Sequence, residues 1–128
     1  MSLATFRLQK YVVEMIRPTH NTAESLAEVQ KALATNEATD HDIILAYFNQ
    51  GVLTGDWDGP HISPIAAYDQ EAGQVLIMDV DREWYIPYWA PDTKLVQAML
   101  RPAPAANGRL AGQKGGLVWI KPSQHRNE

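Results

Sequence analysis

A histidine and two aspartates lie at matching distances from a predicted β-turn, where they could form the acid–base part of a catalytic site. His61 opens an apolar segment that ends at Tyr68, and Asp79 ends a second apolar segment that begins at Gln74, with Asp81 just beyond it. A histidine held by a carboxylate is the general base and its orienting group in enzymes that use a serine or cysteine nucleophile. These residues therefore point to nucleophilic catalysis, and the nucleophile is the group still to be found.

The turn between these two segments leaves two pairings open. Residues 69–73 have the length of a hairpin loop and end on a glycine, the residue that most easily takes a positive φ. A symmetric turn places His61 opposite Asp81 and Ser63 opposite Asp79, whereas a turn one residue tighter places His61 opposite Asp79. Because residues that face one another in an antiparallel pair project to the same side, all four side chains share one face in either register.

Apolar runs predict the strands that surround this hairpin. Both faces of the hairpin are themselves largely apolar, which predicts an interior position in the sheet. Pro64 lacks the N–H that a ladder needs, so a bulge or an unpaired position is expected there. The most N-terminal strand has no earlier element to pair with, which favours a fold that begins upstream of this chain. Outside the hairpin, strands are predicted at residues 11–16, 43–48 and 117–120.

Two helices complete the prediction. Asn21 caps the first, which ends near residue 35, and Asp92 caps the second, which Pro102 stops. The predicted fold class is α+β, with a mostly antiparallel sheet of four to five strands and two helices in a single domain. The remaining segments read as loops at residues 49–60 and 83–91, a flexible connector rich in Ala, Pro and Gly at 102–115, and a tail at 123–128.

The composition argues against several kinds of function. The formal net charge of −4 and the lack of a basic stripe argue against a nucleic-acid partner, and no apolar run approaches the ~20 residues of a membrane span. The chain has no cysteine, which rules out a disulfide, a thiolate metal site and a cysteine nucleophile of its own. Asp56, Asp58 and His61 match no known ligand spacing, so no metal site is predicted. The charged start is unlike a secretory signal, and a cytoplasmic location is expected.

The hairpin and its flanks also resemble a known family. The segment GPHISPIAAYDQEAGQVLIMDVDREWYIPYW is similar to the catalytic β-half of phytochelatin synthases, which are papain-like enzymes. The family pattern is a Gly-x-His-x-Ser-Pro-x-x-x-Tyr strand, an apolar strand that ends in Asp-Val-x-Arg, and an aromatic–Pro–x–Trp stretch. The resemblance covers most of residues 22–121. The positions that match are Gly59, His61, Ser63, Pro64, Tyr68, Asp79, Val80, Arg82, Pro87 and Trp89.

The resemblance implies a transpeptidase of metal detoxification that acts on glutathione, usually as a heavy-metal thiolate. In that family a cysteine attacks the peptide carbonyl, glycine leaves, and the γ-glutamylcysteinyl group passes to a second glutathione or to water. By motif, His61 is the implied general base, and Asp79 rather than Asp81 is the implied orienting group. Arg82 is an implied anchor for a substrate carboxylate because a guanidinium fork matches that group, and Ser63 and Trp84 are expected beside the substrate.

The family places its nucleophilic cysteine and its oxyanion-hole amide in a helical half N-terminal to everything matched here. We therefore expect residues 1–128 to be a partial domain, the C-terminal half of a papain-like catalytic domain, and to be inactive alone. The chain would be a truncated product, one partner of a split enzyme or a degenerate relative. The expected partners are a glutathione-type thiol peptide and a cysteine-bearing N-terminal half or second subunit. The alternative is a non-catalytic interaction module whose open side takes a partner or a second copy.

Overall fold

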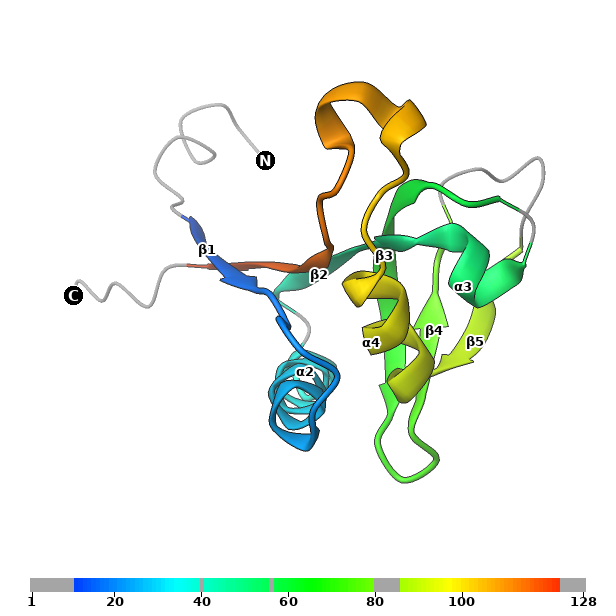
Figure 1. Cartoon of the computed structure of the whole chain (residues 1–128). Coiled ribbons are helices and arrows are strands. Elements are labelled where there is room, and N and C mark those ends of the chain that lie inside the picture. Colours follow the sequence, from blue (N-terminus) through cyan, green and yellow to red (C-terminus); the bar gives the residue numbers. More distant parts are fainter. Residues whose placement is uncertain (1–10, 40, 56, 80–85, 123–128) are drawn as a thin grey trace.

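The computed structural model describes residues 11–39, 41–55, 57–79 and 86–122, and its centre is one antiparallel sheet (Figure 1). Six strands follow the order β1-β6-β2-β3-β4-β5, so the predicted α+β class is confirmed and the strand count is one higher than expected. The strands are β1 (Tyr11–Ile16), β2 (Ile43–Asn49), β3 (Pro60–Asp69), β4 (Gln74–Ile77), β5 (Tyr88–Pro91) and β6 (Gly116–Pro122); the helices are α2 (Ala23–Glu37), α3 (Gln50–Thr54), α4 (Asp92–Leu100) and the 3-10 helix η1 (Ala105–Leu110).

Helices α2 and α4 pack on one face of the sheet and form the core with it. Alternate residues of β2 point into this core, because successive side chains of a strand project to opposite faces. The helices contribute apolar residues at spacings of three and four, which line one side of a helix. Among the fully buried side chains of this core are Ile44, Phe48, Val29, Leu33, Leu95 and Met99.

Several predicted element boundaries differ from the structure. The N-cap of α2 is Thr22, not Asn21: the Thr22 hydroxyl accepts a hydrogen bond from the backbone N–H of Ser25 at 3.2 Å. The predicted aromatic loop contains β5, which is the additional strand, and the predicted loop after β2 begins with α3. The segment at 102–115 holds η1. Strand β1 pairs with β6, so its pairing carries no information about upstream residues.

The turn of the β3–β4 hairpin matches neither of the two predicted registers. Asp69 pairs with Gln74, which leaves residues 70–73 as the loop, and the glycine at its end has φ +67°. This pairing relates the strands by an odd offset. Continued unchanged, it would place Asp79 and His61 on opposite faces of the sheet.

A β-bulge at Ala66 shifts the register so that Asp79 and His61 lie on the same face of the sheet. Beyond the bulge Ile65 pairs with Ile77, and the N–H of Met78 donates to the carbonyl of Pro64 at 3.0 Å. This is the register that the symmetric turn predicts, and it returns the histidine and the aspartate to one face. The irregularity expected at Pro64 therefore occurs two residues further along the strand.

The hairpin buries only one of its two apolar faces within the described part of the chain. Ile65 and Ile77 are buried on the helix side, whereas Ile62 and Met78 on the other side are exposed. The prediction that both faces are interior is wrong for this chain by itself. Among the described residues, no helix combines the length and the apolar character needed to cross a membrane.

Candidate functional site

The hairpin brings His61 and Asp79 into direct contact. The Nε2 atom of His61 lies 3.2 Å from both Oδ1 and Oδ2 of Asp79, at the long end of the range for an N–H···O hydrogen bond. The carboxylate is fully enclosed, whereas 15% of the histidine side chain is exposed. A buried acceptor thus holds an imidazole that remains accessible from one side.

This contact selects the tautomer of the ring. A carboxylate can only accept, so the neutral His61 carries its proton on Nε2 and presents the lone pair of Nδ1. Phe48, which lies opposite His61 in the β2–β3 register, packs against the imidazole edge to face, with ring centroids 5.9 Å apart and an interplanar angle of 73°. Asp79 and Phe48 together fix the orientation of the ring. Sequence reasoning identified the carboxylate but missed the phenylalanine, whose only signal was its place in the preceding apolar strand.

Of the other predicted site residues, one is buried and two lie outside the described residues. Ser63 lies on the same face as the pair and is completely buried, and its hydroxyl has no hydrogen-bond partner among the described residues. Its predicted contact with substrate stays a prediction. Arg82 and Trp84 lie outside the described residues, as does Asp81, so their predicted positions also stay predictions.

A polar cluster beside the site was not anticipated. The Asn49 amide donates to Asp58 Oδ1 at 2.8 Å, and Arg101 donates to both oxygens of Asp58 at 3.1 and 3.2 Å. The hydrogen bond from Asn49, and then Arg101, hold the pKa of the Asp58 carboxyl below its usual value. Asn49 pairs with Pro60 in the β2–β3 register, so the cluster adjoins the start of the histidine strand.

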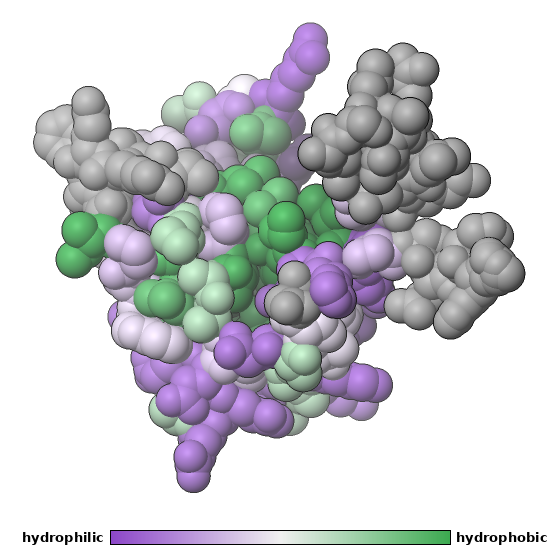
Figure 2. Space-filling model, turned by 180° about the vertical axis from the view of Figure 1, so that it is seen from behind, coloured by the Kyte–Doolittle hydropathy of each residue, from purple (hydrophilic) through white to green (hydrophobic). Residues whose placement is uncertain are grey.

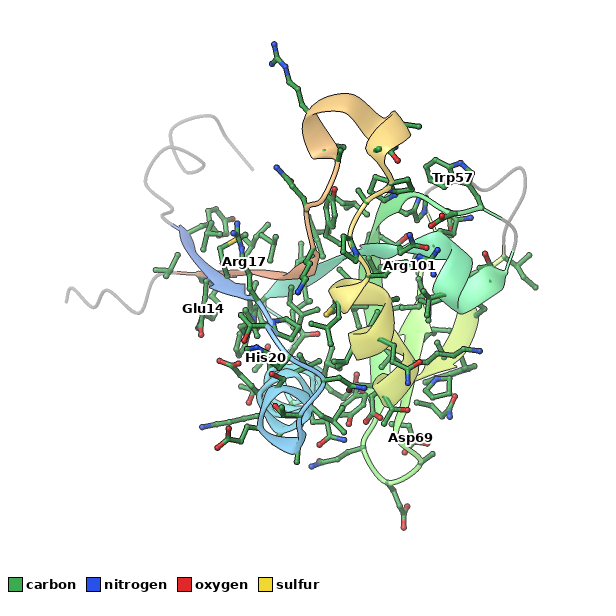
Figure 3. All side chains as sticks on the ribbon, in the orientation of Figure 1. Glu14, Arg17, His20, Trp57, Asp69 and Arg101 are labelled. Atoms are coloured by element: carbon green, nitrogen blue, oxygen red, sulfur yellow. The ribbon has the colours of Figure 1, made fainter. Side chains whose placement is uncertain are left out.

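This cluster borders a hollow of about 270 Å³. Figure 3 shows Trp57 and Arg101, which both line it, at the same corner of the molecule. Asp58 therefore pairs with a distant arginine, and its sequence neighbourhood showed only a Gly/Asp-rich turn. In the described residues, no group of three or more His, Cys, Asp or Glu side chains could hold a metal ion.

A second buried carboxylate, Asp92, joins three elements away from the histidine. Its Oδ2 accepts from the Tyr68 hydroxyl at 2.8 Å and from the Gln30 amide at 2.9 Å, and its N–H donates to the Gly73 carbonyl at 2.9 Å. Burial, and then the hydrogen bond to Asp92, raise the pKa of the Tyr68 hydroxyl. The backbone N–H of Tyr68 also donates to Glu37 at 3.0 Å. Tyr68, which matched the family pattern, thus ties the hairpin to α2 and α4.

Comparison with known proteins supplies the wider context for this geometry. The family model for phytochelatin synthase matches residues 2–109. A Lotus japonicus protein named glutathione gamma-glutamylcysteinyltransferase 3 is 34% identical over 88 residues, which are 68% of this chain and 17% of that protein.

Two further relatives carry the same name. Glutathione gamma-glutamylcysteinyltransferase of Schizosaccharomyces pombe is 31% identical over 98 residues, which are 77% of this chain and 22% of that protein. Glutathione gamma-glutamylcysteinyltransferase 1 of Arabidopsis thaliana is 30% identical over 87 residues, which are 68% of this chain and 17% of that protein. The match thus spans less than a quarter of each relative. With a family model that covers most of its length, this chain belongs to the phytochelatin synthase family.

Proposed function

We propose that this chain supplies the general base and its orienting carboxylate for papain-like acyl transfer on glutathione or a related thiol peptide, while another segment or polypeptide supplies the cysteine. The single observation that carries the proposal is the contact of His61 Nε2 with the buried Asp79, which leaves Nδ1 available to a thiol. The names of the curated relatives support a γ-glutamylcysteinyl donor.

In the proposed reaction, Nδ1 of His61 takes the proton of the incoming thiol. A free thiol has a pKa of ~8.5 and is mostly protonated at neutral pH, so an adjacent imidazole increases the thiolate fraction. The thiolate attacks the carbonyl of the cysteinyl–glycine bond, His61 returns the proton to the departing glycine amine, and a thioester remains. A second thiol peptide or water then accepts the acyl group. Asp79 stabilises the imidazolium between the two proton transfers.

The substrate would be recognised by residues beside this pair. In our proposal the Arg82 guanidinium binds a substrate carboxylate, Trp84 walls the groove, and Ser63 supports its floor. Heavy-metal ions enter as glutathione thiolates, that is, as part of the substrate. The same proposal places the protein in the cytoplasm, in a pathway of metal detoxification.

The test is reconstitution of glycine release from glutathione. The purified chain is mixed with a cysteine-bearing N-terminal segment of the Lotus japonicus relative, with and without cadmium, and released glycine is measured. We expect release in the mixture and none from this chain alone. Release should disappear with His61→Ala and persist with the control His20→Ala, which changes an exposed histidine in contact with its neighbour Thr19. Glycine release by the chain alone contradicts the proposed division of labour.

A second measurement tests the geometry without a partner. Nitrogen-15 chemical shifts of the imidazole report which ring nitrogen carries the proton. We expect the neutral ring of His61 in the isolated chain to be in the Nε2–H form, and to become a mixture of tautomers in Asp79→Ala. A His61 protonated on Nδ1 contradicts its role as a base through that atom.

A non-catalytic interaction module is the second candidate function. One observation favours it, the exposed apolar face on the side of the sheet away from the helices. Failure of reconstitution with every cysteine-bearing half, together with a specific partner for that face, would favour this function over catalysis.

A further inference from the structure

The face of the sheet away from α2 and α4 is apolar from one edge almost to the other. Backbone pairing places side chains of five strands in one continuous row on this face. Figure 2, which views the molecule from behind, shows a hydrophobic area in the middle of the surface. In order across the sheet, the row consists of Met15, Val118, Leu45, Pro64 and Met78.

The next row along the strands leaves its two outer side chains well exposed. It consists of Val13, Ile120 and Ile43, and the outer two side chains are 57% and 55% exposed. Monomeric proteins seldom leave contiguous apolar patches of this kind open, and large ones mark interaction sites. No described residue covers the two exposed side chains, so the face is incompletely buried within the chain.

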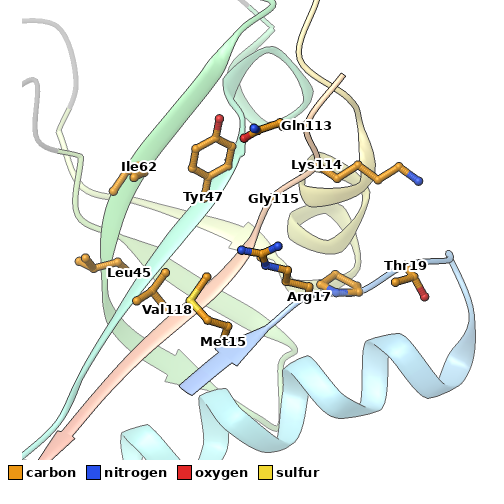
Figure 4. A pocket seen from close by; sticks show the side chains of 12 residues that line it. Met15, Arg17, Thr19, Leu45, Tyr47, Ile62, Gln113, Lys114, Gly115 and Val118 are labelled. Carbon is orange, nitrogen blue, oxygen red and sulfur yellow. The ribbon is translucent and has the colours of Figure 1, made fainter. Parts of the chain in front are cut away.

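The same face is hollow from its central row toward the opposite end of the strands. A cavity of about 580 Å³ lies there, and it is lined by Met15, Leu45 and Val118 of the central row as well as by Tyr47 and Ile62 (Figure 4). Glycines 115 and 116 form its floor because the backbones approach too closely for a side chain: a Cβ at Gly115 would lie 1.8 Å from the Tyr47 carbonyl oxygen. The face therefore carries exposed apolar side chains at one end of its strands and a cavity that extends from its central row toward the other end.

We propose that this face is the interface of a homodimer, in which a second copy packs its sheet face to face with the ends exchanged. Each strand then lies opposite the same strand of the second chain and runs in the opposite direction. Val13 and Ile43 of each chain enter the cavity of the other. Such a two-fold contact uses one patch twice, so the patch must be complementary to itself. Exposed apolar side chains beside a cavity on the same face meet that requirement, and two sheets pack well face to face.

The size of the face is adequate for a dimer. With strands ~4.8 Å apart and ~3.3 Å per residue, its flat footprint is roughly 500–600 Å² before side-chain corrugation is added. A standard protein interface buries ~800 Å² per partner. Two such footprints total about 1,000–1,200 Å², which is at the lower limit for a specific interface.

The charges around the cavity also favour this arrangement over one in which the strands of the two copies run in the same direction. The charged residues that line the cavity are Arg17 and Lys114, both cations. A parallel arrangement would bring these cations of the two copies together. With the ends exchanged, the cations of the two chains stay apart. Arg17 then faces the exposed ring of Tyr11 in the second chain, with which it can form a cation–π contact.

The dimer leaves the proposed catalytic pair free. His61 pairs with Phe48 and points to the helix side of the sheet, away from this face. The inference therefore does not depend on the proposed function, and the two can fail separately. Loss of His61-dependent glycine release would leave the dimer intact, and loss of the dimer would leave the geometry of the pair intact.

Sedimentation velocity over about 1–100 µM protein tests the proposal. We expect a dimer for the native chain and a monomer for Val13→Glu/Ile43→Glu, with the dissociation constant raised at least about 100-fold because two charges per chain enter an apolar contact. The matched control is Val12→Glu, which changes a residue of similar exposure on the other face of the same edge strand. It should remain dimeric.

The outcomes separate clearly. A native chain that is monomeric throughout this range overturns the proposal, as does a dimer that survives the double substitution. Equal disruption by Val12→Glu would mean association through the strand edge and also overturns it. Circular dichroism verifies folding, and the milder Val13→Ser/Ile43→Ser pair, which only removes apolar area, should weaken the dimer in the same direction if the charged pair unfolds.

Discussion

Asp79 and Asp92 are both buried aspartates of the same fold, but they accept hydrogen bonds from different kinds of donor. Asp92 is surrounded by donors that cannot titrate near neutral pH, the Tyr68 hydroxyl and the Gln30 amide, each from a different element. Asp79 faces an imidazole that is partly accessible. Burial of a carboxylate thus does not identify a catalytic group. The kind of donor it holds, and whether that donor can reach a ligand, is what separates the two.

The largest effect should follow from removing the acceptor of His61. Asp79→Ala should lower reconstituted glycine release by about 10²–10³-fold, because the imidazole loses both its orientation and the stabilisation of its charged form. Asp79→Asn should cost only about 10-fold, since its amide oxygen can still accept from Nε2–H. The measurement is glycine release at saturating partner. Equal losses for both variants would mean that charge, not orientation, is the contribution of Asp79.

Asp92 should show the opposite profile, with a large effect on stability. Asp92→Ala leaves a buried hydroxyl and an amide without their acceptor, so the free energy of unfolding should fall by about 2–4 kcal/mol. Urea unfolding followed by tryptophan fluorescence measures this change, and the exposed Glu28→Ala is the control. Asp79→Ala should lower the same quantity by less than about 1 kcal/mol. If it destabilises as much as Asp92→Ala, the contrast between the two carboxylates is wrong.

Tyr68→Phe tests how much one of the two donors to Asp92 contributes to stability. The free energy of unfolding should fall by about 1–2 kcal/mol, because one donor to Asp92 is lost while Gln30 remains. Burial and Asp92 raise the pKa of Tyr68 in the folded state above its unfolded value of about 10. The contribution of this hydroxyl is therefore complete below pH 10 and is lost as the pH rises further. The native chain should lose stability at alkaline pH faster than the phenylalanine variant, as monitored by tyrosinate absorbance.

The smallest effect concerns Asp42, a carboxylate at the surface. Burial alone would raise its pKa, but hydrogen bonds from Thr39, Trp119 and Asn36 outweigh it and lower the pKa. Because the folded pKa lies below the unfolded one, the contribution is present above about pH 4 and is lost as the pH falls through the folded value. Asp42→Asn should therefore destabilise by up to about 1 kcal/mol at pH 7 and less at pH 2.5. A difference that grows toward acid pH would contradict this sign.

The site was predictable in part. The pairing of a histidine strand with an acidic strand follows from apolar alternation and a glycine-ended turn, which are local properties. The face on which Asp79 lies was not determined by the turn, since residues 70–73 alone give the wrong offset and the bulge at Ala66 restores it. No local signal separates a bulge at residue 66 from one at Pro64. The Asn49–Asp58–Arg101 cluster could not be predicted from the sequence either, because its members lie up to 52 residues apart and meet only when α4 packs beside β2.

By itself, the sequence determined five of the six described strands, the two longer helices, the absence of a cysteine, and the family pattern around His61 and Asp79. These depend on side-chain periodicity and composition, which short stretches of chain carry alone. Only the tertiary structure decided the register that brings Asp79 to the face of His61, how β1 and β6 pair in the sheet, and which apolar face remains open. Those outcomes depend on strand register and on long-range packing, where a shift of one residue moves a side chain to the other side of the sheet.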